Sequence, residues 1–155
     1  MTIKRMDHVG VVVDDLEAAT AFFLELGMEL VGKGPVEGRW VDRVVGLDDV
    51  RVEVAFMRTP DGHGQIELTK FHNPVATTAE PHAPANTLGI RRIMFAVEDM
   101  EDVVARLRAH GAELVGDLAQ YTGQSAAAGG REAGYRLCYV RGPEGIIVAL
   151  AEQLS

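Results

Sequence analysis

The chain contains an internal repeat, which restricts its fold more than any other feature of the sequence. When the 155-residue sequence is shifted by 84 positions, residues 8–32 align with residues 92–116 without a gap, and nine of these 25 pairs are identical. Average composition would give about two identities by chance. The ends of the copies also match, since the turn at 60–62 aligns with that at 143–145. Two copies indicate a duplicated module rather than a solenoid.

Each copy predicts the same order of elements, β-α-β-β-β. A β-rich run comes first, and a helix follows whose apolar residues recur at helical spacing. Asp15 and Asp99 stand where an N-cap is expected, and Gly27 and Gly111 where a left-handed residue ends a helix. The predicted strands are residues 8–13, 28–31, 50–58 and 65–71, then 92–97, 113–115, 135–140 and 146–151; the predicted helices are 16–26 and 100–110.

The segments between these elements divide the chain. Residues 72–88 contain three prolines and little periodicity, so they are predicted to link a first module, residues 5–71, to a second module, residues 89–153, in one compact domain. The small residues of 121–134 predict a mobile loop, and residues 33–49 are expected to be irregular.

Composition excludes several classes of partner. The formal net charge of −8 leaves no broad basic surface for nucleic acid. No apolar run approaches the roughly 18–20 residues that span a membrane. The single cysteine, Cys138, excludes an internal disulfide and favours a cytoplasmic location. A small organic molecule is the expected partner.

Four segments carry a resemblance to a known family: MDHVGVVVDDLEAATAFF, GQIELTKF, GIRRIMFAVEDM and YRLCYVRGPEGIIVALAEQ. With the paired modules, they resemble the vicinal oxygen chelate superfamily, which includes glyoxalase I, methylmalonyl-CoA epimerase, extradiol dioxygenases, fosfomycin-resistance enzymes and bleomycin-resistance binding proteins. The resemblance implies an α+β fold in which two tandem βαβββ modules form facing curved mixed sheets around a cavity. It also implies homodimerisation, which exposed sheet edges favour.

The resemblance implies a metal site that this chain fills only in part. The enzymes of the family present four side chains to a divalent metal, and those positions map to His8, Glu67, Arg92 and Ala149. Imidazole and carboxylate suit Zn, Ni, Co, Mn or Fe. A guanidinium only donates and repels a cation, and the methyl group of alanine has no donor atom. His8 and Glu67 therefore form a partial metal site, or Arg92 pairs with Glu67 while His8 bonds to either one.

Residue alternation suggests which side chains would line the cavity. His8 shares one strand face with Val12, and Arg92 shares the equivalent face with Met94. Arg92 would then anchor an anionic group of a ligand. The other candidate wall residues are Phe56 and Tyr121, with Trp40 on a loop at the mouth; the candidate apolar residues are equally compatible with an ordinary core.

Two classes of function follow. The leading prediction is a small-molecule binding protein like the bleomycin-resistance members, without a complete metal site or a firmly implied cofactor. The alternative is a metal-dependent lyase, isomerase or epimerase of the glyoxalase I or methylmalonyl-CoA epimerase type, which stabilises an enolate and uses Glu67 as the base. A purely structural role has no positive feature in its favour.

Overall fold

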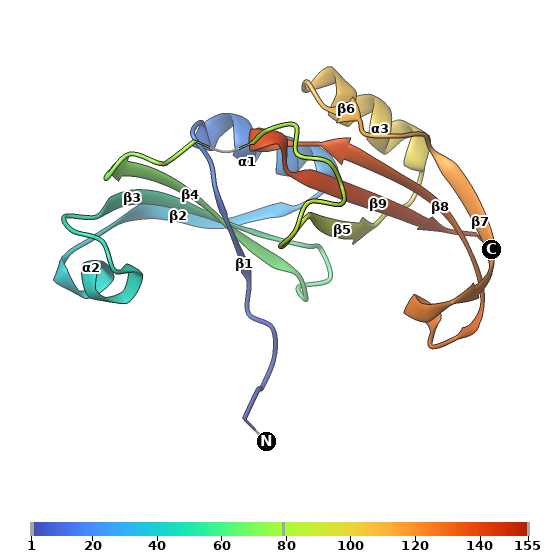
Figure 1. Ribbon diagram of the computed structural model, residues 1–155, viewed down its shortest axis with the longest axis horizontal. Helices are drawn as coiled ribbons and strands as arrows, with labels where there is room; N and C mark the ends of the chain where they lie inside the picture. The colour runs from blue at the N-terminus through green and yellow to red at the C-terminus, as the bar shows by residue number, and fades with distance from the viewer. Residues whose placement is uncertain (1, 79, 155) are drawn as a thin grey trace. The chain divides into compact units, whose positions relative to one another are not determined.

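The structure of the protein is a computed structural model that describes residues 2–78 and 80–154. Over these residues the chain forms three α-helices and nine strands, and the strands make two mixed sheets. Figure 1 labels these elements. The chain divides between residues 79 and 80 into two compact units, one for each copy of the repeat. The predicted α+β class with two modules is confirmed.

The first unit contains one four-stranded sheet. Its elements are β1 (Val9–Val12), α1 (Leu16–Leu26), β2 (Glu29–Glu37), α2 (Arg39–Val45), β3 (Arg51–Arg58) and β4 (Gln65–Asn73). The strand order is β1-β4-β3-β2, and β1 runs parallel to β4 whereas the other neighbours are antiparallel. A parallel pair needs a long connection between its two strands, and the rest of the module supplies that connection between β1 and β4.

Helix α1 covers one face of this sheet, here called the covered face; the opposite face is called the open face. The Asp15 side chain accepts a hydrogen bond of 3.0 Å from the Ala18 N–H, and Gly27 ends the helix with a φ of 115°. Asp15 and Gly27 therefore have the capping roles that the sequence predicts. The helix buries Ala19, Phe22, Phe23 and Leu26 over a sheet whose buried side chains include Val11, Ala55, Met57, Ile66 and Leu68.

Helix α2 was not predicted, since residues 33–49 were expected to be irregular. Its Val41 packs against Val50 and Val52, with Val36, Val54 and Phe71 around them. The Asp42 carboxylate accepts hydrogen bonds from the N–H groups of Asp49 and Val50, at 3.2 and 2.7 Å. The helix spans only seven residues, so packing against the sheet, rather than local periodicity, stabilises it.

Strand β2 is irregular. Leu30 pairs with Met57 and Gly32 with Phe56, so one extra residue forms a β-bulge between Leu30 and Gly32. In a regular strand, Leu30 and Lys33 would point to opposite faces. The bulge places both on the covered face. β2 is an edge of the sheet and extends six residues beyond its predicted end.

The second unit contains a five-stranded sheet. Its elements are β5 (Arg92–Ala96), α3 (Met100–Ala109), β6 (Glu113–Leu114), β7 (Ala119–Ser125), β8 (Arg131–Arg141) and β9 (Ile147–Gln153), with short 3-10 turns at Ala126–Ala128 and Pro143–Gly145. The order is β5-β9-β8-β6, β5 runs parallel to β9, and β7 pairs with β8. α3 covers one face with the buried residues Met100, Val103, Val104 and Leu107.

The start of α3 differs from that of α1. Asp99 was predicted to cap it, but it has a φ of 56° and its side chain makes no capping hydrogen bond. The Glu152 carboxylate of β9 accepts a hydrogen bond from the Met100 N–H at 3.2 Å instead. Arg136 of β8 donates to Glu152 at 3.2 Å and also pairs with Glu101. Glu152 of β9 therefore takes the place that Asp99 was expected to have as the cap of α3.

The predicted mobile loop at 121–134 is wrong. Tyr121 pairs with Tyr135 in a regular antiparallel ladder, and β7, the first 3-10 turn and the start of β8 form a hairpin. The ladder uses backbone groups, so the small side chains of this segment, which gave no strand signal, do not prevent it. Of the described helices, none is long and apolar enough to cross a membrane.

Residues that were expected to link the modules are ordered in part. β4 continues to Asn73, and Arg141 of β8 donates to the carbonyl oxygens of Gly145 and Ala83 at 3.0 and 2.7 Å. A side chain on Gly145 would place its Cβ 2.0 Å from the Pro81 carbonyl oxygen. Only glycine permits this close approach, so residues 81–83 pack against the turn before β9.

Candidate functional site

The open face of the first sheet carries the predicted pair of histidine and glutamate. Val11 of β1 is 8% exposed and faces α1, whereas Val12 is 50% exposed and faces the other way. His8 directly precedes β1, and its contact with Glu67 places its side chain on the same face as Val12. Glu67 of β4 lies opposite Gly10 on one side and opposite Phe56 on the other, so the pleat brings it to the same face.

His8 and Glu67 are in contact. The Nε2 atom of His8 lies 3.4 Å from Oε2 of Glu67, and the two side chains are 33% and 26% exposed. The imidazole ring meets the Phe56 ring edge to face, with the centroids 5.3 Å apart. Thr69 donates its hydroxyl hydrogen to Oε1 of Glu67 at 2.9 Å. Glu67 is therefore held on one side by a hydroxyl and on the other by imidazole.

Asp7 completes this arrangement and was missed by the sequence analysis. Its Oδ2 lies 2.7 Å from Nδ1 of His8, and its Oδ1 accepts a hydrogen bond of 3.1 Å from Arg5. The hydrogen bond from His8, and secondly that from Arg5, lowers the pKa of the Asp7 carboxyl below its ordinary value. Alternation would place neighbouring residues on opposite faces, but β1 begins only at Val9, so Asp7 can turn toward the ring.

These contacts determine what the imidazole can do. An ionised Asp7 only accepts, so the proton of neutral His8 lies on Nδ1 and the lone pair on Nε2. That lone pair faces a carboxylate oxygen that also accepts. A proton or a cation shared by Nε2 and Glu67 would satisfy both. The His8–Glu67 pair can therefore share or pass on a proton, and it supplies two coordinating atoms for a metal ion.

The second unit presents a different chemistry. Arg92 of β5 places its guanidinium carbon 5.2 Å from the centroid of the Tyr139 ring on β8. Ala149 of β9, paired with Met94 and Tyr139, is fully buried. Neither Arg92 nor Ala149 can coordinate a cation. Among the described residues, no group of three or more histidine, cysteine or acidic side chains could hold a metal ion. The residues present do not fit the family's four-ligand metal site.

The predicted wall residues lie on several elements. Val12 and Phe56 share the open face of the first sheet with His8, and Met94, 47% exposed, shares a face of β5 with Arg92. Trp40 lies on α2 rather than on a loop and is 61% exposed. Tyr121 lies on β7 rather than in a mobile loop, and its hydroxyl donates to the Gln124 carbonyl. Their contact with a ligand stays a prediction, as does the Arg92–Glu67 pair.

Comparison with known proteins decides the family. Residues 5–150 match the family described as Glyoxalase/Bleomycin resistance protein/Dioxygenase superfamily. The chain belongs to this superfamily. A solved relative in the superfamily is the glyoxalase family protein from Bacillus cereus, which is 48% identical with a TM-score of 0.89; the alignment covers 100% of this chain and 97% of that one.

More distant members share the superfamily fold alone. A glyoxalase/dioxygenase from Nostoc punctiforme is 17% identical with a TM-score of 0.62, over 99% of this chain and 94% of that one. The glyoxalase family protein from Enterococcus faecalis is 20% identical with a TM-score of 0.57, over 98% and 100% of the two chains. No curated protein sequence matches the chain.

Proposed function

We propose that the chain binds a small organic molecule through an anionic group, without a complete metal site. The observation that carries this proposal is Arg92, whose guanidinium lies over the Tyr139 ring. The family resemblance implies that the metalloenzymes carry a metal ligand at this position. A permanent positive charge there opposes a metal ion and favours a carboxylate or phosphate.

The geometry of Arg92 supports recognition of an anion. Within the described part of the second unit, no carboxylate forms an ion pair with this guanidinium. A contact with the Tyr139 ring leaves the N–H donors of the guanidinium for an anionic group. Met94 lies two residues along the same strand and offers apolar contact, so an aromatic or amphipathic carboxylate fits this surface.

The test measures binding and metal content together. Phenylacetate and phenylacetamide, which differ in charge but little in shape, are titrated into the protein by calorimetry. We expect phenylacetate alone to bind, and we expect Arg92→Gln to weaken it about tenfold or more. Arg108→Gln, at an exposed position of helix α3, removes the same charge elsewhere and should have no effect.

Metal analysis distinguishes this proposal from a metal-dependent enzyme. The protein is incubated with Zn, Ni, Co, Mn or Fe(II), and excess metal is removed. About one metal ion per wild-type chain that is lost in His8→Ala would overturn the proposal. Equal binding of phenylacetate and phenylacetamide would overturn it as well.

A second candidate function has its own observation in favour. His8 contacts Glu67 at 3.4 Å and Asp7 at 2.7 Å, so a partly exposed chain of proton donors and acceptors lies on the open face. Such a chain could remove a proton next to a carbonyl group, as in a lyase, isomerase or epimerase, with Glu67 as the base. Exchange of such a proton for deuterium, followed by NMR and lost in Glu67→Gln, would support this function.

The expected homodimer and cytoplasmic location also stay predictions.

A further inference from the structure

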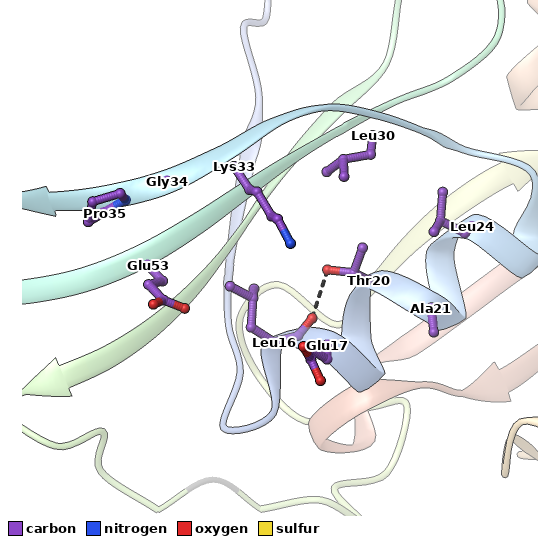
Figure 2. A pocket seen from close by; sticks show the side chains of 10 residues that line it. All are labelled: Leu16, Glu17, Thr20, Ala21, Leu24, Leu30, Lys33, Gly34, Pro35 and Glu53. Carbon is purple, nitrogen blue, oxygen red and sulfur yellow. Dashed lines mark hydrogen bonds between the residues drawn. The ribbon is translucent and has the colours of Figure 1, made fainter.

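An open pocket of about 440 Å³ lies on the covered face of the first sheet, away from His8 and Glu67. Figure 2 shows it between α1 and β2. Leu16, Ala21 and Leu24 form the helix side, and Leu30 and Pro35 form the strand side. The volume falls within the range of about 300–1,000 Å³ that is usual for small-molecule sites. All of the pocket belongs to the first unit.

The β-bulge in β2 builds this pocket. Because of the extra residue, Leu30 and Lys33 point to the same face, where Leu30 adds to the apolar wall and Lys33 reaches over it. Helix α1 directs its buried side chains toward the sheet, while Leu24 is 47% exposed on the side of the pocket. The space between the helix and the edge strand is therefore lined but not filled.

Lys33 is the only cation that lines the pocket. In Figure 2 its side chain extends from β2 toward Leu16 and Thr20 of α1. Within residues 2–78 and 80–154, nothing forms an ion pair or hydrogen bond with its ammonium group. Thr20 cannot donate to a ligand here, because its hydroxyl hydrogen bonds to the Leu16 carbonyl at 2.7 Å. Lys33 is thus the side-chain donor that a negatively charged group would meet.

Two carboxylates at the rim limit the charge of the ligand. Glu53 lies 3.7 Å from Nε2 of His72, and Figure 2 shows the Glu17 carboxylate pointing away from Lys33. Neither pairs with the ammonium group, and both would repel negative charge that is not held directly on Lys33. The pocket therefore fits one anionic group joined to an apolar body.

We propose that this pocket is a second ligand site, which binds a straight-chain aliphatic monocarboxylate with its head on Lys33 and its chain between α1 and β2. Arg92 is not among the residues that line this site, so the proposal does not depend on the function proposed above. The proposal rests on the bulge, the apolar walls and the single unpaired cation, all within one unit.

The test compares three decyl compounds that share one chain: decanoate, decanol and decylamine. Each is titrated below its micelle-forming concentration into ¹⁵N-labelled protein. We expect decanoate to bind most tightly and to shift the amide signals of Thr20, Ala21 and Leu24. Lys33→Gln should weaken decanoate about three- to tenfold and leave decanol unchanged.

Matched variants keep the result independent of folding defects. Ala21→Phe fills the pocket and should abolish binding of decanoate, whereas Ala18→Phe, on the same helix but outside the pocket, should not. Lys4→Gln removes an equal charge from the N-terminal segment and should have no effect.

Three results would overturn the proposal. Decylamine could bind as tightly as decanoate. The signals shifted by decanoate could lie at Val12 or Met94. Ultracentrifugation could show a dimer that Ala21→Phe, but not Ala18→Phe, dissociates, which would mean that a second copy covers the pocket.

Discussion

The Nε2 atom of His8 and the Oε2 atom of Glu67 lie 3.4 Å apart on the open face of the first sheet. Parallel pairing of β1 with β4 sets this relationship, since it aligns the start of β1 with the first residues of β4. Asp7 and Thr69 then orient the two groups from either side. The contact is a property of one module and needs nothing from the second.

The tautomer of His8 is the first prediction. Neutral His8 should carry its proton on Nδ1, because Asp7 accepts there at 2.7 Å. Long-range ¹H–¹⁵N correlation spectra distinguish the two tautomers directly. Asp7→Asn should reduce the Nδ1–H population, while Asp14→Asn, a similar change away from the ring, should leave it unchanged. A wild-type His8 protonated mainly on Nε2 would contradict this prediction.

The second prediction concerns the acid titration of Asp7. The carboxyl should titrate below its ordinary pKa of 3.8, because the ionised form accepts hydrogen bonds from His8 and Arg5. The stabilising effect is present above that ordinary value and is lost as the pH falls through the lowered pKa of the folded state. ¹³C NMR of the side-chain carboxyl measures the midpoint. His8→Gln should raise the midpoint more than Arg5→Gln, and the reverse order would refute the assignment.

A third prediction compares the two helix starts. Asp15→Ala removes the hydrogen bond to the Ala18 N–H and should lower the free energy of unfolding by about 0.5–2 kcal/mol. Asp99→Gly removes no capping bond, and glycine suits the positive φ of that residue. The free energy of unfolding should therefore change by less than about 0.5 kcal/mol or increase. Urea denaturation measures both. Equal losses would show that Asp99 caps α3 after all.

The fourth prediction is that Cys138 is inert in the native protein. Its side chain is 3% exposed, its sulfur lies 3.6 Å from that of Met100, and burial raises the pKa of its thiol. Reaction with an aromatic disulfide reagent at pH 8 should be about 100-fold or more slower than in urea, since it requires local opening. Reaction at the rate of a free thiol would disprove the burial of this residue.

Sequence periodicity predicted the elements that carry their own signals. Helix α1 begins at Leu16 and ends at Leu26, as the N-cap and the following glycine indicated. Helix α2 and strand β7 were missed for physical reasons. α2 depends on Val41 packing against a sheet, and β7 depends on backbone pairing with β8. Neither contact leaves a local pattern in the chain.

The candidate site divides in the same way. Strand alternation and the family resemblance together identified His8 and Glu67 for one face of the first sheet. Asp7 was missed because alternation assigns neighbouring residues to opposite faces, whereas the Asp7 side chain turns toward the His8 ring just before the strand. The aromatic support of Arg92 was missed because the register of β5, β9 and β8 determines which ring lies beneath it. The bulge that turns Lys33 toward α1 has no signature in the residues themselves.

The Glu152–Met100 contact has a consequence for synthesis on the ribosome. The cap of α1 is made within three residues of Asp15, so that helix can begin as soon as its own sequence has emerged. The partner of the first N–H in α3 is translated 52 residues later. The nascent second module must therefore wait for its last strand before its helix is fully anchored, while the first module is already complete behind it.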